Sequence, residues 1–263
     1  MTAVPPPAYP PGRALLDGRV VVVTAAAGAG IGGATARRCL EEGARVVLGD
    51  VHERRLRASL EGLAGEFGAA RVAALPCDVT DEDQVRALYA TAVDRFGRLD
   101  VAVNNAGLGG TDDLVDMTDE RWHRILDVTL TGTMRCTRAA LRLFREQGGG
   151  GAIVNNASVM GWRAQRGQAH YAAAKAGVMA LTRCAALEAA AFGVRVNAVA
   201  PSLAMHPHLV KVTSADLLAE LTRREAFGRY AEPWEVANVI VFLACDLSSY
   251  MTGEVVSVSS RHP

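Results

Sequence analysis

The sequence lacks net charge, long apolar runs and closely spaced cysteines, and each absence excludes a class of protein. Its 28 Lys and Arg residues balance 28 Asp and Glu residues, which argues against a nucleic-acid scaffold or a membrane-surface binder. No apolar run approaches the roughly 18 residues of a membrane-spanning helix, and the N-terminus lacks the features of a signal peptide. The five cysteines are scattered, as in reduced proteins without disulfides or zinc sites. We therefore expect a cytoplasmic protein that binds neither nucleic acid nor membrane.

What the chain does have is enough apolar sequence for a large core and a clear alternation of elements. Half of the 263 residues are hydrophobic. Residues 1–17 hold five of the ten prolines, which predicts an extended arm; composition leaves open whether the arm packs on a neighbouring subunit. In residues 18–260, apolar runs alternate with helical patterns. This rhythm predicts a single Rossmann-type α/β domain, a doubly wound, seven-stranded parallel sheet with helices on both faces.

A glycine-rich turn follows the first predicted strand, 19–24, and precedes a helix predicted to begin at residue 34. Gly28, Gly30 and Gly33 fit the pattern G-x-G-x-x-G. Such glycines allow a tight turn and a close approach of backbone to a pyrophosphate at a helix N-terminus. The position between a strand and a helix favours a dinucleotide site over a plain glycine-rich turn. The loop residues predicted to bind the cofactor are Gly28, Gly30, Ile31 and Gly32.

Asp50 ends the second predicted strand, twenty residues after Gly30. An acid at this place accepts hydrogen bonds from the adenosine ribose hydroxyls and repels a 2′-phosphate, which favours NAD(H) over NADP(H). An Asp here also suits a helix N-cap. Arg54 and Arg55 follow closely, so NADP(H) stays open.

The stretch from Ile153 to Lys175 carries the side chains with the clearest chemistry. An apolar run ending at Ser158 predicts a buried strand that delivers a hydroxyl at its carboxyl end. Tyr171 and Lys175 stand four residues apart and so share one face of a helix. An ammonium beside a phenol lowers the phenol pKa from about 10 and makes the tyrosine a proton donor and acceptor. The alternative is an Ala-rich core helix that carries a Tyr and a Lys by chance.

The chain resembles the classical short-chain dehydrogenases/reductases from about Leu16 to Ser260. The motifs that carry the resemblance are the glycine loop, Asp78-Val79, Asn104–Gly107, Ser158, Tyr171 with Lys175, Arg195–Pro201 and Met251-Thr-Gly253. The resemblance implies hydride transfer between a nicotinamide cofactor and an alcohol or ketone, in a homo-oligomer (tetramer or dimer). It implies that Tyr171 is the acid/base, that Ser158 orients the carbonyl, and that Lys175 holds the nicotinamide ribose and lowers the pKa of Tyr171. It further implies cofactor contacts at Asp78, Val79, Asn105, Ala106, Gly107, Tyr171, Lys175, Pro201 and Ala204.

The chain departs from the pattern of this family at several positions. Ala25 replaces a glycine, and the loop is one residue longer before Gly30. Within a long helix predicted for 120–147, Thr129 replaces an asparagine that holds a water in the proton relay. A threonine hydroxyl binds water or a backbone carbonyl with shorter reach, so we expect activity with an altered relay; a lost relay is the alternative. Ser202 and His206 replace a glycine and a threonine near the nicotinamide.

Residues 202–228 predict a substrate lid. Its apolar contacts are predicted at Met205, Leu209, Val210 and Leu217. His206 and His208 lack a third ligand, so no metal site is predicted.

The sequence thus predicts an NAD(H)-dependent oxidoreductase that interconverts a secondary alcohol and a ketone. A hydrophobic lid suits a hydroxyacyl or 3-oxoacyl thioester or a steroid-like ring alcohol, as in lipid or steroid metabolism. The alternatives are an NADP(H)-dependent 3-oxoacyl reductase and a non-catalytic NAD(H)-binding protein.

Overall fold

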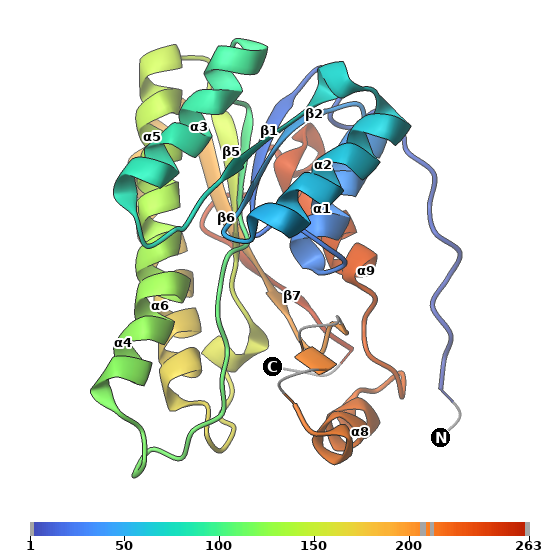
Figure 1. Cartoon of the computed structure of the whole chain (residues 1–263), viewed down its shortest axis with the longest axis vertical. Helices are drawn as coiled ribbons and strands as arrows, with labels where there is room; N and C mark the ends of the chain where they lie inside the picture. Colours follow the sequence, from blue (N-terminus) through green and yellow to red (C-terminus); the bar gives the residue numbers. More distant parts are fainter. Residues whose placement is uncertain (1–2, 206–208, 211–212, 261–263) are drawn as a thin grey trace.

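A computed structural model describes residues 3–205, 209–210 and 213–260. Seven parallel strands form one sheet in the order β3-β2-β1-β4-β5-β6-β7, with helices on both faces (Figure 1). The strands are β1 Val20–Thr24, β2 Arg45–Asp50, β3 Val72–Pro76, β4 Val101–Asn104, β5 Gly151–Asn156, β6 Val194–Pro201 and β7 Val255–Val258. The main helices are α1 Ile31–Glu41, α2 Glu53–Phe67, α3 Glu82–Phe96, α4 Asp119–Leu126, α5 Gly132–Gln147, α6 Ala169–Ala189, α8 Ala215–Arg224 and α9 Pro233–Ala244. The predicted doubly wound sheet is confirmed.

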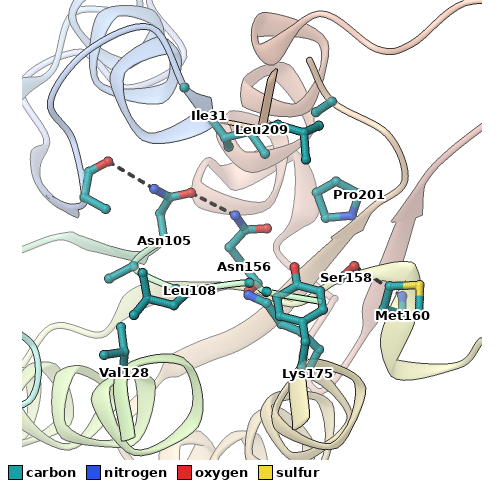
Figure 2. Close-up of a pocket in the computed structure, with 18 of the residues that line it drawn as sticks. Ile31, Asn105, Leu108, Val128, Asn156, Ser158, Met160, Lys175, Pro201 and Leu209 are labelled. Carbon is teal, nitrogen blue, oxygen red and sulfur yellow. Dashed lines mark hydrogen bonds between the residues drawn. The ribbon is translucent and has the colours of Figure 1, made fainter. Parts of the chain in front are cut away.

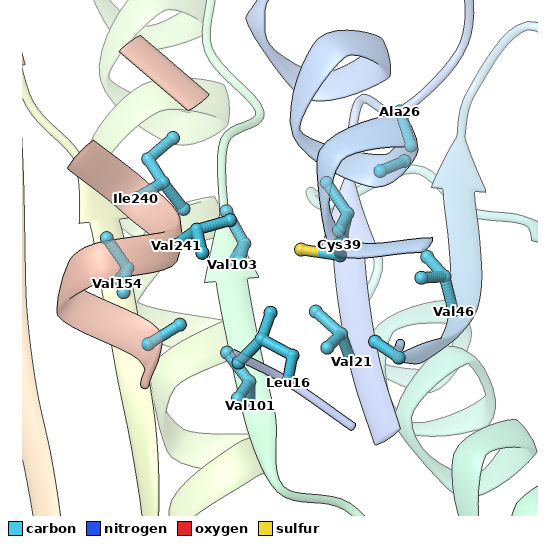
Figure 3. Packing of buried hydrophobic residues seen from close by; sticks show 14 of the residues in the cluster. Leu16, Val21, Ala26, Cys39, Val46, Val101, Val103, Val154, Ile240 and Val241 are labelled. Carbon is cyan, nitrogen blue, oxygen red and sulfur yellow. The ribbon is translucent and has the colours of Figure 1, made fainter. Parts of the chain in front are cut away.

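Strand β1 shows why its sequence is a continuous run of valines. Both faces of the strand are covered, and all five of its residues are buried. Val21 and Val23 belong to the core cluster formed with α1, α2 and α9, which Figure 3 shows from close by. Val20 and Val22 belong to the cluster on the opposite face, formed with α3, α5 and α6. Because successive side chains point to opposite faces, a strand between two helical layers needs apolar residues at every position.

The order of strands reverses at β1, whose two neighbours are β2 and β4. Val22 lies opposite Val47 on one side and opposite Ala102 on the other. The loops that leave the carboxyl ends of β1 and β4 therefore turn toward opposite faces of the sheet. In sheets of this kind, ligands bind in the crevice that this divergence opens.

The predicted long helix of residues 120–147 is divided in the structure. Helix α4 ends at Leu126, the π-helical turn η2 covers Asp127–Thr131, and α5 begins at Gly132. Helical structure thus runs through residues 119–147 as predicted, but the π-helical turn within it was not predicted, because apolar periodicity does not report a single extra residue in a turn. π-turns inside helices are frequent at functional sites, and this one carries Thr129.

Residues 3–13 form no helix or strand; their first part lies against this chain's own C-terminal part, and residues 9–13 lie against α1, where Arg38 donates to the carbonyl oxygens of Pro10 and Pro11. The N–H of Val4 donates to the carbonyl oxygen of Phe227 at 2.9 Å, and Nε of Arg229 donates to the carbonyl oxygen of Val4 at 2.8 Å. The ring of Tyr9 meets that of Trp234 edge-on, with 5.3 Å between centroids. The arm is thus fixed to the segment between α8 and the start of α9.

None of the helices within the described residues is long and apolar enough to cross a membrane.

Candidate active site

The carboxyl ends of the strands open onto one cavity of about 1980 Å³. Ser158, Tyr171 and Lys175 border this cavity together with all the residues predicted to bind the cofactor. These are Gly28, Gly30, Ile31, Gly32, Asp50, Asp78, Val79, Asn105, Ala106, Gly107, Pro201 and Ala204. The structure therefore brings together motifs that lie up to 176 residues apart in the sequence, from Gly28 to Ala204.

The glycine loop presents backbone to the cavity. A Cβ atom added at Gly28 or Gly30 would meet nothing within 4 Å, so this side of the loop is open to a ligand. Gly32 lies the other way, where a Cβ would sit 2.1 Å from the carbonyl oxygen of Ala25. Helix α1 begins at Ile31 rather than at the predicted residue 34, and no side chain caps its N-terminus. Its first N–H groups are therefore left for an anion, so the loop fits a pyrophosphate.

Ala25, where the family pattern has glycine, adopts a left-handed backbone with φ of 50°. The amide of Asn105 holds this turn by donating to the carbonyl oxygens of Thr24 and Ala25, at 3.1 and 3.2 Å. A residue with a Cβ atom in this conformation costs about 1 kcal/mol relative to glycine. The predicted departure therefore leaves the turn in place and adds strain to it.

The carboxylate of Asp50 lies between the glycine loop and the start of α2. It accepts hydrogen bonds from the N–H groups of Ala27 and His52, at 3.1 and 2.9 Å, and lies 3.9 Å from Nη2 of Arg55. Burial raises the pKa of Asp50, against the opposing effects of the Ala27 N–H and Arg55. The N-cap of α2 is His52 and not Asp50, so the capping alternative does not apply. Asp50 braces the loop and borders the cavity.

Figure 2 shows two of the catalytic candidates, Ser158 and Lys175, among the residues that line the cavity. Ser158 lies two residues after the end of β5, and its Oγ accepts a hydrogen bond from the N–H of Met160 at 3.2 Å. Tyr171 and Lys175 lie on the first two turns of α6. Nζ of Lys175 is 5.7 Å from the centroid of the Tyr171 ring and donates to the carbonyl oxygen of Asn156 at 2.6 Å.

Burial sets the electrostatics of this site. It lowers the pKa of Lys175 from 10.5 to about 8, because desolvation disfavours the ammonium. Burial also raises the pKa of Tyr171, although the hydrogen bond with Ser158 opposes this. The causes of this shift are burial and the contact with Ser158, and the ammonium of Lys175 is directed at the Asn156 carbonyl. That Lys175 lowers the pKa of Tyr171 stays a prediction.

Thr129 does not border the cavity. It is completely buried, and its Oγ1 both accepts from the N–H of Leu108 at 3.0 Å and donates to the carbonyl oxygen of Leu108 at 3.1 Å. The partner that the structure shows for this hydroxyl is therefore the backbone of Leu108. The loop it holds brings Gly107 against the active site, where an added Cβ would lie 3.3 Å from Nζ of Lys175.

Two of the four apolar residues predicted to contact a substrate border the cavity, and the lid itself stays a prediction. Leu209 and Leu217 border the cavity, whereas Met205 and Val210 do not. Ser202 also borders it, and its hydroxyl donates to the carboxylate of Glu225 at 3.3 Å. His206 and His208 lie outside the described residues. Within the part of the chain that is described, no group of three or more His, Cys, Asp or Glu side chains is placed to hold a metal ion.

Among the residues that border the cavity, sequence reasoning missed Asn156 and Leu108. Asn156 had a signal, since it is a second consecutive asparagine at the end of an otherwise apolar strand. Leu108 follows a functional motif and carries no signal of its own.

Comparisons with known proteins agree with this geometry. A family model described as enoyl-(acyl carrier protein) reductase matches residues 25–260. The chain is 64% identical, over 96% of both chains, to a Mycobacterium tuberculosis protein named (5R,7aS)-5-hydroxy-7a-methyl-1-oxo-2,3,5,6,7,7a-hexahydro-1H-indene-carboxyl-CoA reductase. It is 45% identical to cis-4-hydroxycyclohexanecarboxylate dehydrogenase of Sinomonas cyclohexanicum, over 93% of this chain and 96% of that one. The crystal structure of a short chain dehydrogenase from Mycobacterium smegmatis matches 98% of both chains with a TM-score of 0.87 and 60% identity.

The chain therefore belongs to the short-chain dehydrogenase/reductase family. It is an oxidoreductase, and the family implies a nicotinamide cofactor. The open glycine loop and the uncapped N-terminus of α1 fit such a dinucleotide.

Proposed function

We propose that this protein interconverts an alcohol and a ketone on an alicyclic ring whose carboxyl group is carried as a coenzyme A thioester, with NAD(H) as cofactor. The observation that carries the chemistry is that Ser158, Tyr171 and Lys175 border the cavity onto which the glycine loop opens. The names of two relatives, a bicyclic carboxyl-CoA reductase and a hydroxycyclohexanecarboxylate dehydrogenase, support the ring substrate.

In this proposal the chain's own residues move the proton and hold the oxygen. When bound, the nicotinamide supplies or takes up the hydride. In reduction, the Tyr171 hydroxyl gives its proton to the carbonyl oxygen as the alcohol forms; in oxidation, the phenolate takes the hydroxyl proton back. The hydroxyl of Ser158 orients the substrate oxygen beside the phenol. The ammonium of Lys175 binds the nicotinamide ribose and stabilises the phenolate left after proton transfer.

Residues 202–228 form the substrate lid in this proposal. Apolar side chains from this segment border the cavity opposite the catalytic residues and suit a saturated ring. They are Leu203, Leu209, Leu217 and Leu221.

Asp50 supports NAD(H), and Arg55 supports the alternative of an NADP(H)-dependent 3-oxoacyl reductase. Both residues border the cavity, and Arg55 is the group that would attract a 2′-phosphate. We expect Asp50→Ala to weaken NADH binding and to narrow the difference between NADH and NADPH. If wild-type protein binds NADPH more tightly than NADH, the cofactor assignment is wrong.

The test of the substrate is turnover with matched pairs of compounds. The CoA thioesters of 4-oxocyclohexanecarboxylate and of a bicyclic oxo acid are compared with the free acids and with a linear 3-oxoacyl-CoA, each with NADH and NADPH. The proposal expects the ring thioesters to give the highest kcat/KM, with NADH. A preference for the linear 3-oxoacyl thioester supports the alternative reductase. Cofactor binding without turnover of any compound supports a non-catalytic role.

The proposal also includes a cytoplasmic location and a homo-oligomer. The homo-oligomer rests on the resemblance to the family. Light scattering at micromolar concentration measures the assembly, and a monomer contradicts it.

A further inference from the structure

Asn156 is the last residue of β5 and lies between the two halves of the active site. Its side chain is 9% exposed and borders the cavity. The backbone carbonyl of Asn156 accepts the hydrogen bond from Lys175, and its side-chain amide donates to Oδ1 of Asn105 at 2.8 Å. Its remaining polar atom, the side-chain Oδ1, is buried and has no hydrogen-bond partner in the protein.

The orientation of this amide follows from its neighbours. Nδ2 of Asn105 faces two carbonyl oxygens, those of Thr24 and Ala25, so this atom must be the nitrogen. The other atom of the Asn105 amide is therefore the acceptor Oδ1, and only the nitrogen of Asn156 can face it. The oxygen of Asn156 is consequently the atom without a partner. Figure 2 shows it on the side of the amide turned away from Asn105.

We propose that Oδ1 of Asn156 is a cofactor-binding acceptor that receives a hydrogen bond from a hydroxyl of the nicotinamide ribose. The inference rests on the proposed nicotinamide-dependent function and adds a contact to it. A buried acceptor without a partner destabilises the free protein, and a ligand donor that fills it recovers this loss on binding. The ribose is the part of the cofactor with hydroxyl donors that Lys175 is proposed to hold, and Lys175 is tied to the same residue.

A pair of substitutions separates this acceptor from the contact with Asn105. Asn156→Leu and Asn156→Asp both remove the amide donor to Asn105, but only the aspartate keeps an oxygen acceptor at this place. We expect the leucine variant to bind NADH about tenfold more weakly than wild type, as for one lost hydrogen bond. We expect the aspartate variant to recover most of this affinity as the pH falls, because a protonated carboxyl donates to Asn105 and still accepts from the ligand.

The matched control is Asn238→Leu. Asn238 lies on α9, does not border the cavity and also has a buried Oδ1 without a partner. This variant should leave the affinity for NADH unchanged. The thermal stability of the Asn156→Leu protein without cofactor should change little. The substitution removes the unpaired Oδ1 of Asn156, but it also leaves Oδ1 of Asn105 without its donor.

Binding of cofactor fragments locates the donor, and calorimetry measures it without turnover. Asn156→Leu should weaken ADP-ribose as much as NADH and leave ADP unchanged, because only ADP lacks the second ribose. Unchanged affinity of this variant for ADP-ribose, or equal losses in the leucine and aspartate variants at every pH, would overturn the inference. Wild-type protein that binds neither NADH nor NADPH would overturn the proposed function itself, and the inference with it.

Discussion

The two walls of the cavity are built on different physical terms. The catalytic wall, formed by the ends of β1, β4 and β5 and the start of α6, carries several destabilising features. A buried ammonium at Lys175, an acceptor without a partner at Asn156 and a left-handed alanine at Ala25 all lie there. The second wall is formed by the proposed lid, residues 202–228, and is called the lid wall. Its polar groups have hydrogen-bond partners: the carboxylate of Glu225 accepts from Ser202 and from Ser260.

This difference shows which wall of the cavity lowers the stability of the fold. A catalytic group must be held in a geometry and protonation state that the free protein does not favour, so the catalytic wall costs stability. The lid wall has no such demand, and its contacts only need to hold a shape. Substitutions in the catalytic wall should therefore lower activity without lowering the free energy of unfolding. Changes to the lid wall should alter substrate binding alone.

The largest expected effect comes from Tyr171, the group proposed to move the proton. Tyr171→Phe should lower kcat about a thousandfold with little change in the affinity for NADH, because only proton transfer is lost. Steady-state kinetics and fluorescence titration of NADH measure the two quantities. The control Tyr250→Phe changes a fully exposed tyrosine and should have no effect. Turnover by Tyr171→Phe within tenfold of wild type would exclude Tyr171 as the acid/base.

The next effect tests whether the catalytic wall costs stability. Lys175→Met should raise the free energy of unfolding at pH 7 by up to about 3 kcal/mol, because it removes a buried charge. Between pH 8 and 10.5 the unfolded chain binds a proton at Lys175 that the folded chain does not. The free energy of unfolding of the wild-type protein therefore rises with pH relative to that of the variant. The difference should be largest below pH 8 and close toward pH 10.5.

Urea unfolding at several pH values measures this difference, and activity should be lost in the same variant. A Lys175→Met protein that is less stable than wild type at pH 7 would show that Lys175 stabilises the fold. The comparison between the two walls would then not hold.

How much the sequence predicted also differs between the walls. Ser158, Tyr171 and Lys175 come from short motifs whose strand and helix place them locally, and the structure brings them to one cavity. The π-turn at Thr129 depends on a single extra residue in a helix. The side-chain oxygen of Asn156 lacks a partner because of how its amide is oriented. Neither feature can be read from the periodicity of the sequence. The contacts of the lid wall join residues as distant as Val4 and Phe227, so only the folded chain shows them.

The arm gives a way to change the lid wall alone. Removing residues 1–8 deletes the hydrogen bonds of Val4 with Phe227 and Arg229 but keeps Tyr9 against Trp234. With each of the two bonds contributing about 1 kcal/mol, KM for the ring thioester should rise by up to about thirtyfold. The values of kcat and of the NADH affinity should change little, since no arm residue borders the cavity. The control Tyr9→Phe removes the hydroxyl contacts with Glu41 and Arg38 and leaves the bonds of Val4 in place. A loss confined to kcat would contradict a role through the lid.

The smallest effect concerns the strained turn beside the cofactor loop. Ala25→Gly should raise the free energy of unfolding by no more than about 1 kcal/mol, because glycine adopts a φ of 50° without a steric cost. The gain is limited, since glycine also adds conformational freedom to the unfolded chain. The affinity for NADH should stay the same, because Asn105 bonds only to backbone at this turn.

The control Ala29→Gly changes the same loop at a residue without positive φ and should be neutral or destabilising. A stability loss in Ala25→Gly equal to that of the control would show that the turn at Ala25 is not strained, and one of the three costs assigned to the catalytic wall would be withdrawn.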